Sequence, residues 1–274
     1  MGSFPFTYLG LPLGVNKPKV IDCLPLVKKC EQRLLATSAF LLQAGRLEVT
    51  NSIFTALSMY FMSTFKLHKT VVKQIDKYRK HYLWRGSDIN VRSAPEAAWE
   101  LVRLPKKEGG LGVLNLETHN DALLLKNLHN FFNRQDIPWV HLICESYYND
   151  GSLPSSSKRK GSFWWKDILK LIDFFKGMAM IHIPDGATCL FWDDLWNSRV
   201  PRLSYPELYS FAKDPLISLK MAWAVDGPEQ LLHLPISNEA LHLFNELVQG
   251  LNDLDFNANH DIWTYIWGSI LLIN

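Results

Sequence analysis

The stretch LHKTVVKQIDKYRKHYLWR, residues 67–85, is the segment around which the first half of the chain is organised. At about 100° per residue, its apolar side chains fall on one narrow stripe of a helix. The stripe consists of Val71, Ile75, Tyr78 and Tyr82. The opposite side carries Lys69, Lys73, Lys77 and Lys80. The stripe therefore suits a protein core, and the lysine side suits either solvent or a phosphate backbone.

The composition is that of a soluble globular protein, but the charge is unevenly distributed. Hydrophobic residues make up 47% of the 274 residues and charged residues 20%, which suits about two units with sizeable cores. Residues 1–110 carry 17 Lys and Arg against 8 Asp and Glu, whereas residues 171–274 carry 5 against 13. This asymmetry indicates one part that faces a polyanion and another part with a different role.

Several functional classes lack their sequence signals. The four cysteines have neither a CxxC spacing nor matching histidine pairs, which argues against a zinc site, and we expect no cofactor. No glycosylation sequon or cleavable signal is visible, so the expected location is intracellular, either nuclear or cytoplasmic. The longest uncharged run, residues 49–65, is too short and too polar to span a membrane. We therefore expect no transmembrane segment and no membrane partner.

Periodicity and turn residues predict a mainly α fold, with a helical bundle followed by a smaller α+β segment that contains a β-hairpin. Residues 4–14 suit a strand and a turn, and residues 86–117 look irregular. Apolar runs at 178–183 and 188–192 flank the turn Pro184-Asp185-Gly186 and predict the hairpin. The expected helices cover residues 25–37, 46–61, 67–85, 118–133, 139–148, 163–175 and 238–248, and the expected last strand covers residues 261–267.

Residues 151–161 are polar and rich in breakers, so the boundary between two parts of the chain is expected there. Ser162, directly after this segment, is a plausible N-cap for the next helix, and Ser237 is a plausible N-cap for the last helix. The glycine-rich segment 106–112 lacks the Gly-Lys-Ser/Thr ending of a phosphate loop, so a tight turn is expected instead.

Catalytic residues are not evident. Nucleotide polymerases hold two metals with paired aspartates, and the chain has such a pair at Asp193 and Asp194. The pair follows an apolar run and does not lie in a hairpin turn, so local capping or salt bridges are expected. Histidines are scattered, without a nucleophile motif. Arg46, just after Gly45, suits either phosphate binding at a helix N-terminus or an ordinary exposed or intrahelical role.

Several segments together resemble the polyproteins of plant LINE-type non-LTR retrotransposons, in the reverse-transcriptase region just after the polymerase palm. Each segment is short, but all recur in the family's order across nearly the whole chain. The segments cover residues 2–14 (GSFPFTYLGLPLG), 44–47 (AGRL), 75–79 with 83–86, 105–106 with 109–112, 120–126 (NDALLLK), 163–167 (FWWKD), 191–196 (FWDDLW) and 263–268 (WTYIWG).

The resemblance implies an excised middle of a longer enzyme. In the family, a catalytic aromatic-Ala-Asp-Asp turn lies upstream of the YLGLPLG segment, and the Cys/His zinc-binding region lies beyond the WTYIWG segment. The implied parts are the palm end in 1–14, a helical thumb-like domain in 15–150, a linker in 151–162, a connection in 163–260 and the truncated start of the zinc-binding region in 261–274. We therefore expect the chain to have no polymerase activity on its own, although the parent family consists of RNA-directed DNA polymerases.

The expected partner is the backbone of a template–primer duplex, which a thumb grips weakly and largely without reading bases. The residues expected to contact nucleic acid are Arg46, Lys69, Lys73, Lys77, Lys80 and Arg85. Two other interpretations stay open. In the first, the chain is a protein-interaction or self-associating module that uses side chains which once faced the palm, at Phe4, Phe6 and Tyr8. Alternatively, it is a gene-model remnant with no selected function.

Overall fold

The computed structural model describes residues 6–36, 41–88, 90, 94–155, 160–254 and 256–266. This part of the chain forms two compact units, of which the first ends at Leu124 and the second begins at Leu125. The division falls inside helix α5 (Leu116–Phe132). Helices dominate both units, and the strands described form two small two-stranded sheets, so the predicted mainly α fold is confirmed.

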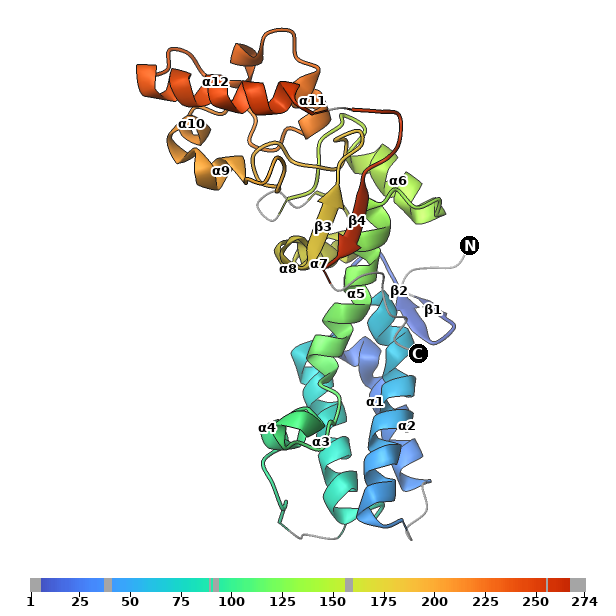
Figure 1. Cartoon of the computed structure of the whole chain (residues 1–274). Helices are drawn as coiled ribbons and strands as arrows, with labels where there is room; N and C mark the ends of the chain where they lie inside the picture. Colours follow the sequence, from blue (N-terminus) through green and yellow to red (C-terminus); the bar gives the residue numbers. More distant parts are fainter. Residues whose placement is uncertain are drawn as a thin grey trace. The chain divides into compact units, whose positions relative to one another are not determined.

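Three long helices that contact one another form the body of the first unit, and they run side by side in Figure 1. A short antiparallel hairpin of β1 and β2 precedes them and pairs Phe6 with Leu13. The elements of this unit before α5 are β1 (Phe6–Tyr8), β2 (Leu11–Leu13), the 3-10 helix η1 (Val20–Cys23), α1 (Leu24–Leu35), α2 (Gln43–Thr64), α3 (Lys69–Arg85), α4 (Trp99–Val102) and the 3-10 helix η2 (Lys106–Glu108).

Helix α3 has the amphipathic pattern that the sequence predicts. Val71, Ile75 and Tyr82 are fully buried, and Tyr78 is half-buried. The imidazole of His68 caps the helix by accepting the backbone N–H of Thr70 at 3.2 Å. The helix ends at Gly86, which has a φ of 75° that favours glycine. Local sequence therefore determines both the buried stripe and the ends of this helix.

The corner between α2 and α3 is held by one side chain from α5. The amide of Asn120 donates to the carbonyl oxygens of Met62 at 2.7 Å and Phe65 at 2.9 Å. Its carbonyl oxygen accepts the N–H of Leu67 at 2.8 Å. Met62 lies in the last turn of α2, and Phe65 and Leu67 lie in the connection to α3, so the helices themselves leave these three groups without a backbone partner. Asn120 is buried and thus serves as a hydrogen-bonding plug for the corner.

The short helix α4 packs its Trp99 and Val102 against Leu83, near the end of α3. The glycine-rich turn that follows α4 is tight, as the sequence predicts. Gly109 has a φ of 82°, and a Cβ on Gly110 would lie only 2.1 Å from the carbonyl oxygen of Leu104. The glycines are therefore explained by backbone packing.

The second unit combines short helices with one small sheet. It contains the rest of α5 followed by α6 (Pro138–Tyr147), α7 (Phe163–Leu169), α8 (Ile172–Met178), β3 (Ala179–His182), α9 (Pro201–Ser204), α10 (Pro206–Ser210), α11 (Leu219–Trp223), the 3-10 helix η3 (Pro228–Leu231), α12 (Asn238–Asn252) and β4 (Ile262–Tyr265). The expected N-caps are confirmed, because the hydroxyls of Ser162 and Ser237 accept the N–H groups of Trp165 and Ala240.

An aromatic cluster forms part of the core of this unit. The ring of Phe132 stacks on Phe175 with centroids 5.4 Å apart, and it also contacts Trp263 at 5.1 Å. Phe131 contacts Trp165 at 4.9 Å. All five rings are almost completely buried, and aromatic pairs of this geometry stabilise a core beyond the area that they bury.

The prediction that residues 178–183 and 188–192 form a hairpin is wrong, because β3 pairs with another strand. Residues 188–192 do not pair with β3; instead β3 runs antiparallel to β4, with Ile181 opposite Trp263. The cause is Asp261, directly before β4, whose carboxylate accepts the N–H groups of Asp185, Gly186 and Thr188 at 2.7–3.2 Å. The turn after β3 is thus bound to a distant residue, and the alternating segment near the end of the chain becomes the second strand.

The boundary expected at 151–162 is described only in part, because residues 156–159 lie outside the described chain. Leu153 and Ser155 are buried, so the described part of this segment packs against its surroundings. The assignment of separate roles to residues 1–14, 15–150, 163–260 and 261–274 stays a prediction.

Candidate nucleic-acid interface

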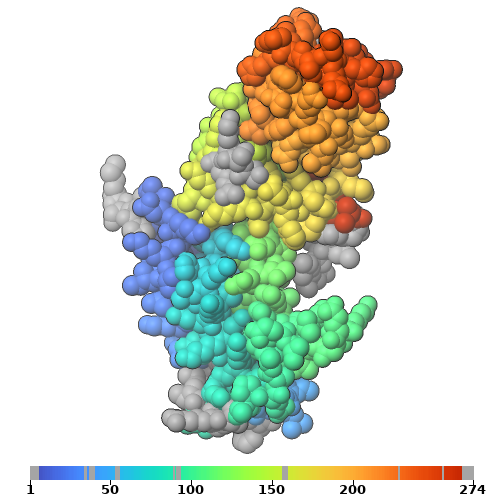
Figure 2. Space-filling view, turned by 90° about the vertical axis from the view of Figure 1, so that its left-hand side faces the viewer, coloured from blue at the N-terminus to red at the C-terminus, as the bar shows by residue number. Residues whose placement is uncertain are grey.

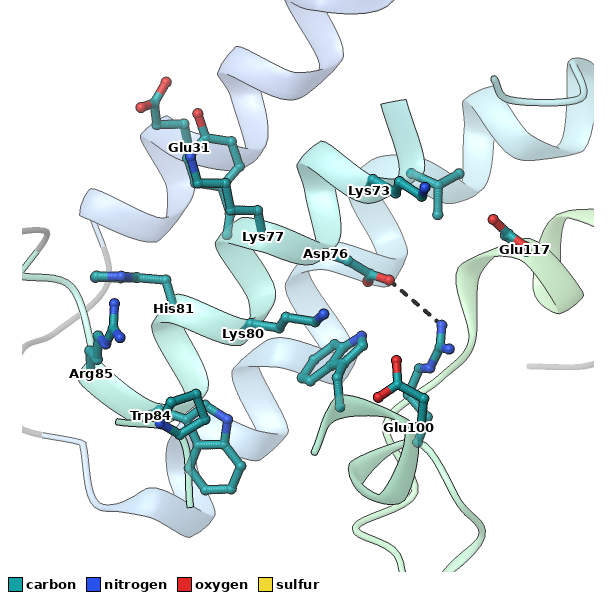
Figure 3. A pocket seen from close by; sticks show the side chains of 15 residues that line it. Glu31, Lys73, Asp76, Lys77, Lys80, His81, Trp84, Arg85, Glu100 and Glu117 are labelled. Carbon is teal, nitrogen blue, oxygen red and sulfur yellow. Dashed lines mark ion pairs between the residues drawn. The ribbon is translucent and has the colours of Figure 1, made fainter. Parts of the chain in front are cut away.

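The four lysines of α3 are all exposed, as the sequence predicts. Lys73, Lys77 and Lys80 project from successive turns of the helix and line one groove, whereas Lys69 is not part of its lining. Figure 3 shows the three side chains along α3, with Glu31 on the α1 side and Glu100 and Glu117 across the groove. The structure therefore gathers three of the four predicted lysines at one surface.

The groove has a volume of about 800 Å³ and is formed entirely by the first unit. Its walls come from α1, α3, α4 and the beginning of α5, and α1 (blue) and α3 (cyan) lie side by side on the face in Figure 2. The basic lining residues are Lys73, Lys77, Lys80, Arg85 and Arg103. The acidic lining residues are Glu31, Asp76, Glu100 and Glu117.

The lysines of this mixed surface are not neutralised by direct ion pairs. Within the described residues, none of Lys73, Lys77 and Lys80 has a carboxylate oxygen within ion-pair distance. Of the four acidic residues, Asp76 is committed to arginines: Arg79 binds it at 2.8 Å, and Arg103 lies 3.7 Å away. The groove thus keeps available positive charge along α3, with carboxylates at its margins.

Arg79 is a feature that the sequence analysis missed. Its guanidinium is fully buried, binds Asp76 and donates a second hydrogen bond to the carbonyl oxygen of Leu114 at 2.9 Å. Burial lowers the pKa of Arg79, and the neighbouring Asp76 opposes this shift. A signal was present, because Arg79 lies four residues after Ile75 and three before Tyr82, on the apolar stripe. The pair joins α3 to the chain segment before α5.

Trp99 and Arg103 bring α4 into the groove, although the sequence predicts only irregular structure there. The ammonium of Lys80 lies 5.4 Å from the centroid of the Trp99 ring, and the guanidinium carbon of Arg79 lies 5.7 Å from it. Both distances allow cation–π attraction. Figure 3 marks the ion pair of Asp76 with Arg103 by a dashed line.

The two predicted arginines occupy different surroundings. Arg85 lines the groove. Arg46 lies in the first turn of α2, and its Nε donates to the carbonyl oxygen of Leu41 at 3.0 Å. The Arg46 guanidinium also lies against Gly86, where a Cβ would be 3.1 Å from its central carbon. Arg46 therefore has local structural contacts, and its predicted phosphate binding stays a prediction.

Burial shifts the pKa values of several titratable groups near the groove. The pKa of Cys30 rises to about 11, chiefly through desolvation, so this thiol is protonated at neutral pH. Burial and the nearby Arg79 lower the pKa of His119. Burial and Glu31 raise the pKa of Tyr78. These shifts describe packing and supply no activated nucleophile.

The aspartate pair of the second unit has the local role that the sequence predicts. Asp194 binds Lys176 at 2.6 Å and accepts the N–H of Leu190 at 2.7 Å. Asp193 lies 3.1 Å from Arg202. Across the described ranges, no three His, Cys, Asp or Glu side chains are grouped so that they could hold a metal ion.

The apolar side chains expected at the former palm-facing surface are exposed where they are described. Phe6 is 46% exposed and Tyr8 57%, both on β1. Phe4 lies outside the described residues. Among the helices described, none combines the length and the apolarity that crossing a bilayer requires.

Comparison with known proteins gives two plant relatives. No protein-family model matches the chain. The chain is 30% identical over 165 residues to a protein of Arabidopsis thaliana that is named as a candidate ribonuclease H protein. That match covers 58% of this chain but only 26% of the relative's length. The chain is also 27% identical over 143 residues to an uncharacterized mitochondrial protein of the same plant, covering 52% of this chain and 92% of that protein.

Proposed function

We propose that the chain is part of a plant LINE-type retrotransposon reverse transcriptase, from the region after the polymerase palm, and that it binds the backbone of a nucleic-acid duplex through α3. We further propose that it has no polymerase activity on its own. The ordered segments of family resemblance support the assignment. The two plant relatives, of which the longer is named as a ribonuclease H protein, also support a retrotransposon-related origin.

The observation that carries the binding proposal is the row of lysines in the groove. Lys73 and Lys80 are seven residues apart on one helix, which corresponds to roughly 10 Å along its axis. A duplex carries one phosphate charge per about 1.7 Å of its axis, so this length faces about three phosphates on each strand. Lys73, Lys77 and Lys80 therefore match the density of charge on one strand.

Weak, sequence-independent binding fits the chemistry of this surface. Lysine ammonium groups act as point charges that contact phosphates without reading base edges. Glu31, Glu100 and Glu117 line the same groove and oppose the approach of a polyanion. We therefore expect dissociation constants in the non-specific range of roughly 10⁻⁴–10⁻⁶ M, with strong dependence on salt.

The test is a fluorescence-anisotropy titration of an RNA–DNA hybrid of about 20 base pairs with the full chain. Replacing Lys73, Lys77 and Lys80 by Gln removes three charges and should lower the affinity at least tenfold, with a salt slope shallower by about 2 to 3. The matched control replaces Lys126, Lys166 and Lys213, which are exposed residues of the second unit, by Gln. Equal binding by both triple variants, or no binding by the unaltered chain at low salt, contradicts the proposal.

The exposed hairpin favours a second candidate function, which is self-association through β1. Phe6 and Tyr8 are large apolar side chains, and such exposed groups can recruit a partner surface. Size-exclusion chromatography of the chain alone and with the hybrid separates the two functions. Dimers that form with rising concentration, and that are lost in the double variant Phe6→Ser, Tyr8→Ser, would support self-association. A monomer at all concentrations would contradict it.

A further inference from the structure

The groove wall formed by α4 contains hydrogen-bond donors that have no acceptor. The indole Nε1 of Trp99 and the Nε of Arg103 are buried, and neither has a hydrogen-bond partner among the described residues. Trp99 is only 5% exposed. Buried N–H groups are almost always paired in folded proteins. Both atoms have almost no exposed surface, so a ligand reaches them only when the covering side chains move, and the group that would satisfy them is one that offers acceptors.

Around Asp76, the neighbouring cations outnumber the one carboxylate that they share. Asp76 is shared by Arg79 at 2.8 Å and Arg103 at 3.7 Å, so one carboxylate faces two guanidinium groups. Lys80 adds a third cation, because its ammonium lies 5.4 Å from the Trp99 ring centroid and has no ion pair in the described chain. A water molecule would satisfy the N–H donors, but it would bring no second anion to the guanidinium groups that share Asp76. Glu100 and Glu117 line the groove and form no ion pair in the described chain.

We propose that Arg103, Trp99 and Lys80 form the seat for one phosphate group of the bound strand. A phosphodiester carries one negative charge and offers oxygens that accept hydrogen bonds without donating any, which matches both properties of the wall. The seat rests on the proposed function, and it adds Arg103 and Trp99 to the contact surface. Glu100, next to Trp99 in the chain, and Glu117 line the same groove, so the seat holds a single phosphate between carboxylates.

The first test compares the salt dependence of hybrid binding among single variants. Arg103→Gln should weaken binding about fivefold or more at low salt and reduce the slope by about 0.9, the value for one lost phosphate contact. Lys107→Gln is the matched control, because Lys107 is exposed on η2 and is not in the lining of the groove. Trp99→Phe keeps an aromatic ring but removes the N–H, so affinity should fall several-fold with an unchanged slope.

Arg103→Lys distinguishes a loss of folding from a loss of the phosphate contact. This variant keeps the charge, so the salt slope should return to that of the unaltered chain, whereas only part of the affinity should return. Identical binding by Arg103→Gln and Lys107→Gln would overturn the seat and leave the proposed function intact. If the unaltered chain does not bind the hybrid at all, the proposed function fails first and the seat fails with it.

A second readout observes the donor itself. In a chain labelled with ¹⁵N at the tryptophan indoles, the Trp99 signal is identified by its disappearance in Trp99→Phe. Saturating hybrid should move this signal downfield, as expected for a new hydrogen bond to a phosphate oxygen. A glutamate-rich peptide of equal charge should leave it in place. An unmoved signal with the hybrid, or an equal shift with the peptide, would overturn the assignment to phosphate.

Discussion

Asn133 pairs with the backbone of Trp263 in the manner of a neighbouring strand, although the two residues are 130 positions apart in the chain. The amide oxygen of Asn133 accepts the N–H of Trp263 at 2.9 Å, and its amide nitrogen donates to the Trp263 carbonyl oxygen at 3.1 Å. In the register of the sheet, Trp263 lies opposite Ile181 of β3. The outer edge of β4 is therefore satisfied at this residue by a side chain from the end of α5.

Replacing Asn133 by Ala should destabilise the second unit by about 1–3 kcal/mol, because two backbone groups of Trp263 lose their hydrogen bonds. Urea unfolding followed by tryptophan fluorescence measures the change. Asn130→Ala, in the last turns of α5, provides the control and should cost less than about 0.5 kcal/mol. Equal stability of the two variants would show that solvent replaces the Asn133 amide without penalty.

Asn120→Ala should destabilise the first unit by about 2–4 kcal/mol, because it leaves the carbonyl groups of Met62 and Phe65 and the N–H of Leu67 without their side-chain partner. Hydrogen exchange measured by NMR should show that the N–H of Leu67 loses protection selectively. The exposed Asn149 offers the control variant Asn149→Ala. Unchanged protection of Leu67 would refute the role of Asn120 as the plug of the α2–α3 corner.

Removing one partner of the buried pair should cost more than removing both. Arg79→Ala leaves Asp76 without its closest partner and is expected to destabilise the first unit by roughly 3–5 kcal/mol. Arg79→Met with Asp76→Asn removes both charges, keeps most of the volume and should recover part of that loss. Thermal unfolding by circular dichroism measures both. A double variant that is less stable than Arg79→Ala would mean that the pair itself stabilises the fold.

The first unit should lose stability as the pH falls below about 6.5, the ordinary pKa of histidine, because burial and Arg79 lower the pKa of His119 in the folded chain. Below that pH the unfolded chain takes up a proton that folded His119 resists, so protonation favours unfolding. Urea unfolding of the unaltered chain and of His119→Gln at about pH 7.5 and about pH 5.5 tests this. The variant should lose less stability between the two pH values, and equal losses would contradict the assignment.

Features determined by neighbouring residues were predictable from the sequence. The apolar stripe of α3 and the caps at Ser162 and Ser237 depend on residues within one or two helical turns. Pairing of β3 was not predictable in the same way. A local turn at Pro184-Asp185-Gly186 favours a hairpin, but Asp261 binds that turn from far along the chain.

In the candidate site, too, the features set by local sequence were predictable and those set by distant contacts were not. The lysine face of α3 follows from helical spacing, and three of its lysines share the groove. Trp99 and Arg103 were missed because α4 is a single turn whose position depends on packing against Leu83. Arg79 was missed because a charged residue on an apolar stripe is ordinarily assigned to the surface, whereas here Asp76 and the Leu114 carbonyl compensate its burial.

The carboxylate of Asp261 makes the end of the described chain indispensable to the second unit. Besides three backbone N–H groups, it accepts the hydroxyl of Thr188 at 2.9 Å, and Trp263, two residues further along the chain, completes the aromatic cluster. A shortened version that stops ahead of residue 261 would strip four donors of their acceptor and open Phe132 and Phe175 to water. Any deletion series that maps the smallest folding piece of this protein must therefore retain β4.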